Sequence, residues 1–575
     1  MVLYSRIRRR LVAASVLLAL VAAASGCARG GAAGRATPAP ASGVQVAVFS
    51  SLARLTPTVD VIDTPTSIEL QVARGEHESA QVVVWPTAGE SRVVVETGAL
   101  QGPRGEQLPA SAVHAYLEQP MLVEHGSPGG RAGTYVDPLL PASGRTARLT
   151  PNARLFVWVD VSVPLGTLEG AYDGAVLVRR ADKHGTPLGG SSGILATIPV
   201  QVHVRSATLP AVPTLGSHIG VDASQIERFE QVGSGATKLR DVVDNYAALL
   251  ADARLSIGDV GVLPPGSMPG AAANPGDAAF LEEVFGRRGV ASVRLPFYLD
   301  YPFADPLGAD RAAAVAFLRR SAAWARAQGW GDRMFVFAID EPGDERAGDV
   351  RELYELVHEA DPGLRSLITR ESSATAFRGI VDIWAPNISP TRFHDEDVRR
   401  ERAAGRDTWW YPSITTNEPY PTLFVDDRRP SPRALGWLAW EHGVTGLLYW
   451  SATHWHEVKD PYKDPATYRE PDATGNGDGV LLYPGGPIGL PGTPVPSVRL
   501  MQLRDGVEDH DLLVQATCAA RPADVRAINS AVRLVAPSMD VIKPTDADVE
   551  SLRERLFSAI DAALPSGVCR VGEAG

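Results

Sequence analysis

Two adjacent carboxylates, Asp340 and Glu341, are the strongest chemical signal in the sequence, because they follow an apolar run at residues 335–339 and precede Pro342. Acids at the end of a buried strand are typical of the catalytic rim of a barrel. Successive residues of a regular strand face opposite ways, which would point these two carboxylates apart. Pro342 cannot donate to a sheet ladder, and it biases Glu341 toward extended geometry. We therefore predict that the strand ends here and that both carboxylates turn toward one pocket.

Two carboxylates in one pocket do not ionise independently, so identical groups can serve as an acid and a base. The alternative is an acidic loop that caps the next helix, an interpretation that suits Asp344 and Glu345 better. We predict that Asp340 and Glu341 are the catalytic pair.

Large aromatic side chains gather at or just beyond the ends of predicted strands. Such rings stack on the C–H faces of sugars, although a single ring is more often part of a core. Their shared position at strand ends predicts a sugar-binding cleft, with Trp450 as its floor. The predicted substrate contacts are Trp384, Trp410, Tyr411, Tyr449, Trp450 and Trp455.

The elements that position these residues follow two hydrophobic patterns. Residues 44–208 alternate polar and apolar side chains between turn residues, which predicts an antiparallel β-sandwich domain that supports the chemistry or contacts carbohydrate. Residues 214–515 alternate short apolar runs with helical patterns, which predicts an α/β catalytic domain with a central (β/α)8 TIM-like barrel. The pattern becomes helical after Ser497, where Leu500, Leu503 and Val507 share one face, and residues 516–575 predict a short C-terminal helical extension.

A doubly wound open sheet is the alternative to the barrel, but no Gly-rich phosphate loop follows the first strand, which argues against a nucleotide site. Candidate strands lie at residues 215–221, 257–263, 293–299, 334–339, 366–369, 383–386, 408–411 and 446–450, and candidate helices at residues 239–253, 311–328, 349–359 and 432–442.

The N-terminus predicts export. Arginines within residues 6–10 precede a short apolar run, and the sequence ending at Cys27 resembles a lipobox, so residues 1–27 read as a lipoprotein signal peptide with Cys27 as the lipidated residue. Residues 28–43, rich in Gly, Ala and Pro, predict a flexible tether. We expect an extracytoplasmic protein that is anchored to a membrane through its N-terminal lipid, or secreted if Cys27 is only a cleavage site. The Sec and twin-arginine routes both remain open.

The net charge bears on possible binding partners, and the cysteines bear on a possible disulfide. The formal net charge is −12, and no basic stripe appears outside the signal, so nucleic acid is not an expected partner. Of the three cysteines, Cys518 and Cys569 form an even pair in an oxidising compartment. A disulfide between them would close a loop of about 50 residues and stabilise the tail by roughly 4 kcal/mol. Two unpaired thiols are the alternative.

A metal site is not expected. Residues 472–478 look like part of a calcium loop, but Tyr483 stands where an EF-hand needs its bidentate Glu, so a Gly-rich hairpin is the better interpretation. The histidines show no convincing ligand spacing, and we expect no cofactor.

Several separated motifs together resemble one family, glycoside hydrolase family 123, over nearly the whole mature chain. The motifs are RGEHESAQ at residues 74–81, a Pro/Gly/Tyr pattern within residues 164–174, Asp340-Glu341-Pro342, Tyr420-Pro421, Tyr449-Trp450 with Trp455, NGDG…YPG within residues 476–485, and RDGVED at residues 504–509. The last two are the most specific.

The resemblance implies a sandwich before a barrel and an enzyme similar to β-N-acetylgalactosaminidases that use substrate assistance. It implies that Glu341 protonates the leaving oxygen and later deprotonates water, while Asp340 orients the 2-acetamido group of the substrate. Such an enzyme needs no protein nucleophile, so the usual rule for the spacing of two carboxylates does not apply.

Two alternatives remain open. Glu418 in Asn417-Glu418-Pro419 could act as a nucleophile opposite Glu341 in a retaining two-carboxylate glycosidase. The chain could also be a non-catalytic surface lipoprotein that binds glycans. The natural glycan, endo or exo action and the oligomeric state are not predicted.

Overall fold

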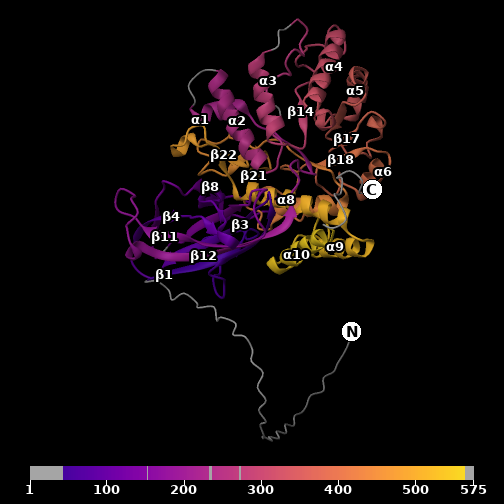
Figure 1. Cartoon of the computed structure of the whole chain (residues 1–575). Helices are drawn as coiled ribbons and strands as arrows, with labels where there is room; N and C mark the ends of the chain where they lie inside the picture. Colours follow the sequence, from indigo (N-terminus) through magenta and orange to yellow (C-terminus); the bar gives the residue numbers. More distant parts are fainter. Residues whose placement is uncertain (1–42, 152, 232–235, 259, 271–273, 564–575) are drawn as a thin grey trace, which may run out of the picture. The chain divides into compact units, whose positions relative to one another are not determined.

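The computed structural model describes residues 43–563 except 152, 232–235, 259 and 271–273 (Figure 1). The predicted signal peptide with Cys27, all but the last residue of the tether, and Cys569 lie outside the described residues. Cys518 lies near the end of a helix and is half-buried, and its disulfide with Cys569 stays a prediction.

The N-terminal part of the described chain forms two β-sheets. One has the order β1-β3-β10-β7-β8 and the other contains β2-β12-β11-β4-β9, with β5 and β6 attached at β11. Their bounds are β1 Val44–Ser50, β2 Ile68–Arg74, β3 His77–Pro86, β4 Ser91–Glu96, β5 Leu100–Gln101, β6 Gln107–Leu108, β7 Val113–Val123, β8 Gly133–Pro141, β9 Ala147–Leu149, β10 Leu155–Ser162, β11 Gly170–Arg180 and β12 Ile194–Thr208.

Alternating side chains of both sheets bury one shared core, which includes Val82 and Val157 from the first sheet and Val176 and Val200 from the second. This is the burial that period-two patterning requires. One feature differs from the prediction of an antiparallel arrangement, because β2 and β12 pair in parallel.

The following region contains one parallel sheet of seven strands that nearly closes into a barrel, in the order β13-β19-β18-β17-β16-β15-β14. The strands are β13 Gly216–Ile219, β14 Val293–Leu295, β15 Met334–Val336, β16 Arg365–Ile368, β17 Ile383–Trp384, β18 Asp407–Trp410 and β19 Gly446–Tyr449. The helices around them are α1 Ala223–Glu230, α2 Ala236–Asp252, α3 Pro275–Leu281, α4 Arg311–Ala327, α5 Ala347–Ala360, α6 Asp395–Ala403 and α7 Ser431–His442.

The predicted strand at residues 257–263 is reduced to a single parallel bridge between Ile257 and Ile219. Serine side chains take over part of the ladder there. Ser217 accepts from the amide of Ser256 at 2.8 Å, and Ser292 donates its amide to Ser256 at 3.2 Å. The sheet therefore has seven strands and one bridged segment in place of the eight predicted strands.

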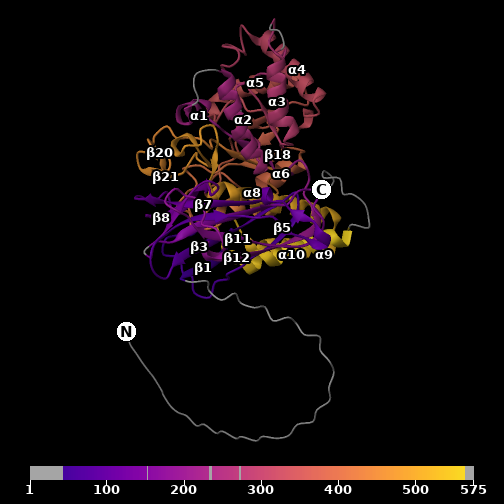
Figure 2. The ribbon, with the colours of Figure 1, turned by 60° about the vertical axis from the view of Figure 1, so that its left-hand side comes forward.

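The predicted change to a helical pattern after Ser497 is confirmed, and only the predicted boundary of the C-terminal extension is misplaced. α8 covers Val498–Ala519, followed by α9 Pro522–Val535 and α10 Asp546–Ala563, so the predicted boundary at residue 516 falls inside α8. Figures 1 and 2 show α8 between the N-terminal sheets and the barrel, and α8 packs against both β8 and α7. Within the described part of the chain, no helix combines the length and apolarity needed to cross a membrane.

Candidate active site

The two carboxylates lie beyond the end of β15, on the rim of the barrel. β15 ends at Val336, residues 337–339 carry no ladder, and Asp340 and Glu341 are both exposed. The early strand end was predicted, but the predicted cause is wrong in one respect. Glu341 does not adopt extended geometry, because its φ is +39°. A non-glycine residue in this region is strained, and such strain gathers at functional sites.

The hydroxyl of Thr369, which follows β16, holds this bend. Thr369 Oγ1 accepts a hydrogen bond from the backbone N–H of Glu341 at 2.6 Å and donates to Asp340 Oδ1 at 2.7 Å. Thr369 is buried, with 3% of its surface exposed. One fixed hydroxyl thus sets the backbone of one acid and the carboxylate of the other.

Tyr411, which follows β18, contacts the second carboxylate. Its hydroxyl donates to Glu341 Oε1. Its backbone N–H donates to the carbonyl of Pro386 at 3.2 Å, and its carbonyl accepts from the N–H of Ile388 at 2.9 Å, so the loop after β17 fixes its position. Burial, the bond to Glu341 and the negative charge there raise the pKa of Tyr411, so the hydroxyl keeps its proton and acts as a donor.

Two arginines neutralise charge around the pair. Arg370 donates to the carbonyl of Pro342 and to Asp344 Oδ1 at 3.1 Å. Arg392 donates to Glu371 Oε2 at 3.0 Å. The bond to Glu371 is the main cause of a raised pKa of Arg392, and the charge of Glu341 adds to it.

Trp450 is the half-buried member of the predicted aromatic cleft. It lies directly after β19, and three strands separate β19 from β15 along the sheet, which places Trp450 across the barrel mouth from the acids. Its ring packs edge-on against His454 at 4.7 Å and Tyr468 at 5.4 Å.

Asp478 accepts a hydrogen bond from Trp450 and fixes its ring. The sequence pattern predicted only a Gly-rich hairpin at residues 472–478 and gave Asp478 no role. Asp478 Oδ1 accepts from Trp450 Nε1 at 3.1 Å, Tyr449 Oη at 3.2 Å and the backbone of Gly479 at 3.0 Å. Burial raises the pKa of Asp478 to about 6. Gly479 has φ +71°, and an added Cβ there would lie 2.4 Å from the Trp450 ring, so only glycine fits.

For four of the six predicted sugar contacts, the structure contradicts the prediction. Trp384, Trp410, Tyr449 and Trp455 expose 1% of their surface or less, so their rings pack in the core and offer no face to a sugar. A large aromatic ring at a strand end satisfies the same sequence pattern whether it points into the core or into the mouth.

The two largest charged motifs lie in the interior. Residues 74–81 lead into β3, and residues 504–509 lie on α8. Arg504 donates to the two oxygens of Asp160 on β10 at 2.8 and 3.1 Å, and Ser79 donates to the same carboxylate at 2.7 Å. All three side chains are buried.

A second cluster centred on Asp509 joins the N-terminal sheets to α7 and α10. Arg433 donates to Asp509 at 2.8 Å and to Glu78 at 3.0 Å, while Arg553 pairs with Asp509 at 2.5 Å and with Glu76 at 2.8 Å. Burial opposes ionisation of Asp509, but the charges of Arg433 and Arg553 outweigh it and hold its pKa below the usual value. The charged side chains of these motifs therefore join the N-terminal sheets to α7, α8 and α10.

Glu418 lies at the junction with the N-terminal domain. Its backbone packs so closely on Gly129 that a Cβ on that glycine would lie 2.6 Å from the Glu418 side chain. Its carboxylate lies 3.4 Å from Arg429. These contacts do not join Glu418 to the Asp340–Glu341 pair.

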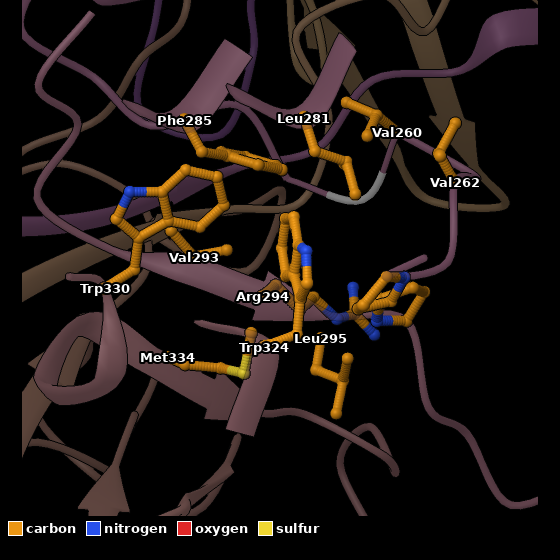
Figure 3. Close-up of a pocket in the computed structure, with 12 residues that line it drawn as sticks. Val260, Val262, Leu281, Phe285, Val293, Arg294, Leu295, Trp324, Trp330 and Met334 are labelled. Carbon is orange, nitrogen blue, oxygen red and sulfur yellow. The ribbon is translucent and has the colours of Figure 1, made fainter. Parts of the chain in front are cut away.

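Two pockets of the described structure lie away from the Asp340–Glu341 pair. The pocket in Figure 3 is enclosed by apolar side chains, including Phe285, Leu295 and Trp324, and has room for about 10 Å³, the volume of one water-sized sphere. A pocket of about 320 Å³ lies between residues 122–125 and the hairpin of β20 (Ala466–Glu470) and β21 (Ala473–Asn476). The acid pair lines neither pocket. Among the described residues, no group of three His, Cys, Asp or Glu side chains is placed to hold a metal ion.

A parallel barrel whose rim carries two hydrogen-bonded carboxylates, with an aromatic ring across the mouth, is compatible with a glycosidase site. Residues 310–516 match the family described as glycoside hydrolase 123, catalytic domain. That region belongs to glycoside hydrolase family 123, and the resemblance seen in the sequence is confirmed.

One solved structure supports the fold. A family 123 glycoside hydrolase from Clostridium perfringens, described for glycolipid glycan hydrolysis, is similar with a TM-score of 0.64 and 12% identity, covering 91% of this chain and 98% of that chain. A β-glucuronidase from Bacteroides uniformis has a TM-score of 0.26 and 11% identity over 77% of this chain and 48% of that chain, and this low score carries no argument. No curated protein sequence matches the chain.

Proposed function

We propose that this protein removes a terminal 2-acetamido sugar, provisionally β-N-acetylgalactosamine, by substrate-assisted retaining catalysis. The acetamido oxygen attacks the anomeric carbon, the glycosidic bond breaks, and Glu341 gives its proton to the leaving oxygen. Water then opens the resulting oxazoline while Glu341 takes a proton back. Asp340 accepts the acetamido N–H and stabilises the positive charge that develops on the group.

The separate hydroxyl partners of the two acids support this proposal. Thr369 donates to Asp340 Oδ1, so that oxygen is fixed as an acceptor, and we assign Oδ2 to the acetamido N–H. Tyr411 donates to Glu341 Oε1, and we assign the exchanging proton to Oε2. Each acid thus has one oxygen held by the protein and a second oxygen that we assign to the substrate.

The two-carboxylate alternative has less support. A nucleophile must face the anomeric carbon together with the acid, at a carboxyl separation of about 5 Å. Glu418 instead contacts Gly129 and Arg429, whose charge lowers the nucleophilicity of the carboxylate.

A matched pair of aryl glycosides tests the reaction class. We expect hydrolysis of the 2-acetamido-β-galactoside, and turnover at least about 10²-fold slower for the 2-hydroxy analogue, because the analogue lacks the internal nucleophile. A thiazoline mimic of the oxazoline should inhibit competitively. Equal turnover of both glycosides, or indifference to the thiazoline, would overturn substrate assistance. Turnover of neither would favour a glycan-binding protein.

We also propose that the enzyme is exported and anchored through lipid on Cys27, on the strength of the basic, apolar and lipobox-like segments within residues 1–27. Radiolabelled palmitate should label the wild type and not Cys27→Ser, and the variant should move from the membrane to the soluble fraction. Unchanged labelling of the variant would refute the anchor.

A further inference from the structure

The loop after β14 presents two tyrosines beside the acid pair. β14 is the neighbour of β15, and the two strands run in parallel with Leu295 opposite Val336. Residues a few positions further along both strands therefore emerge at the same rim. Tyr298 and Tyr301 follow β14 just as the acid pair follows β15.

Arg294 ties the two strand ends together. Its guanidinium donates to the carbonyl of Phe337 at 2.7 Å and lies 4.6 Å from the centre of the Phe337 ring and 4.6 Å from the centre of the Tyr298 ring. Cation–π contacts on both sides fix the direction of the Tyr298 ring. Phe337 precedes Asp340 by three residues, so the tyrosine loop and the acid pair share one support.

The loop is a tight turn clamped at both ends. The N–H of Tyr298 donates to the carbonyl of Tyr301 at 2.7 Å. On either side of the turn, Phe297 and Phe303 are buried and pack against Phe317 of α4, with ring centres 6.2 and 5.8 Å away. A turn anchored in this way holds its exposed side chains in place, which a sugar-stacking surface requires.

Tyr301 is the most exposed of the large side chains in this turn. Tyr301 is 42% exposed although Phe297 and Phe303 beside it are buried, and its ring centre lies 6.1 Å from that of Tyr298. Two adjacent rings, one fixed on Arg294 and one exposed, form a surface of the size of one sugar ring.

We propose that Tyr301, supported by Tyr298, is the binding platform for the leaving-group sugar. Trp450 follows β19, which three strands separate from β15, whereas the tyrosine loop follows β14, the neighbour of β15. We therefore assign the sugar that is removed to the Trp450 side and the aglycone to the β14 side. The substrate class is then a 2-acetamido sugar linked to a second sugar ring, that is, an oligosaccharide chain. This inference rests on the proposed function and adds the partner half of the substrate.

The test compares two substrates with the same terminal 2-acetamido sugar. One is a disaccharide, and the other is the β-glycosyl azide, whose leaving group has three atoms and no ring to stack. For Tyr301→Ala, the ratio of kcat/KM for the disaccharide to kcat/KM for the azide should fall about tenfold, as expected when one aromatic face is lost. Tyr301→Phe keeps the ring and should keep the ratio of the wild type.

The outcomes separate the two proposals. An unchanged ratio in Tyr301→Ala, with both substrates still cleaved, would overturn the platform and leave the reaction class standing. An equal fall in Tyr301→Phe would also overturn stacking, because only the hydroxyl is missing there. If the wild type cleaves neither substrate, the proposed function fails and the platform fails with it.

Discussion

The interior cluster around α8 and the acid pair at the barrel rim both consist of charged side chains, but they are built in opposite ways. In the interior, Arg504 and Asp160 are buried and hydrogen-bonded to each other at two points. At the rim, Asp340 and Glu341 are exposed, and each accepts a single side-chain hydrogen bond, from Thr369 after β16 and from Tyr411 after β18 respectively. Charges that fasten a structure satisfy one another, whereas charges that react keep an oxygen available for substrate.

The contrast also concerns how recognisable each region is in the sequence. The RDGVED motif on α8 was among the most specific family signals, yet its side chains bond to residues of the N-terminal sheets and of α7 and α10. The proposed chemistry depends on a much shorter signal, Asp340-Glu341-Pro342. A strong family motif therefore indicates shared architecture, and reactivity has to be established from geometry.

The largest expected effect is on activity. Glu341→Gln should lower kcat/KM about 10³-fold for a glycoside with a sugar leaving group, because a poor leaving group needs the proton that Glu341 supplies. The loss should be smaller for a nitrophenyl glycoside, which departs as a stabilised anion. Urea unfolding should be unchanged within about 0.5 kcal/mol, since the side chain is exposed. An equal loss on both leaving groups would contradict the role of general acid.

A substitution in the interior cluster around α8 should instead lower the free energy of unfolding. Arg504→Met leaves Asp160 buried without its cation and should cost about 3–5 kcal/mol of unfolding free energy. The urea midpoint measures this loss. Arg469→Met is the matched control, because that arginine is exposed and its pair with Asp464 contributes about 0–1 kcal/mol. Equal midpoints for the two variants would show that the interior pair does not fasten the domains.

Substitution of Thr369 tests how the two acids are positioned, because this residue contacts both of them without a proposed part in the reaction. Thr369→Val keeps the shape of the side chain and removes the hydroxyl, so kcat should fall about 10²-fold with KM nearly unchanged, as the backbone of Glu341 and the carboxylate of Asp340 lose their common fixed point. Thr369→Ser restores the hydroxyl and should recover most of kcat. If the serine variant is as slow as the valine variant, the hydroxyl is not the positioning group.

The sequence predicted elements whose signals are local. The strand ends near Asp340 and the start of α4 at Arg311 follow from apolar runs and helical periodicity, and both agree with the structure. Thr369 could not be predicted, because its role depends on how β16 lies beside β15, with Val336 opposite Ser366. Glu341 was expected in an extended conformation, since the local effect of Pro342 was the only visible constraint and the bond to Thr369 overrides it.

The aromatic residues show the same limit. Trp450 and Trp455 lie five positions apart in one loop, yet the first is half-buried at the mouth and the second packs against Phe229 in the core. Hydrophobic patterning assigns such rings to a strand end but does not choose between the two faces. Tyr301, in contrast, was missed because a lone tyrosine in a turn carries no periodic signal.

The smallest expected effect comes from a buried carboxyl group that belongs neither to the interior cluster around α8 nor to the acid pair at the barrel rim. Glu118 on β7 is 4% exposed, and within the described residues neither of its oxygens has a hydrogen-bond partner. Burial raises its pKa from 4.5 to about 8, although the charge of Arg54 opposes the shift. The folded state therefore binds the proton more tightly than the unfolded state, and stability should fall as the pH rises from about 4.5 toward about 8.

Glu118→Gln removes this titration and should make the protein more stable relative to wild type at pH 8 than at pH 5, by at least about 1.4 kcal/mol, which corresponds to one unit of pKa. Urea midpoints at the two pH values measure the difference. Glu124→Gln, an exposed change just beyond the same strand, should leave it unaltered. If both variants have the urea midpoint of the wild type at both pH values, Glu118 does not gain a proton on folding.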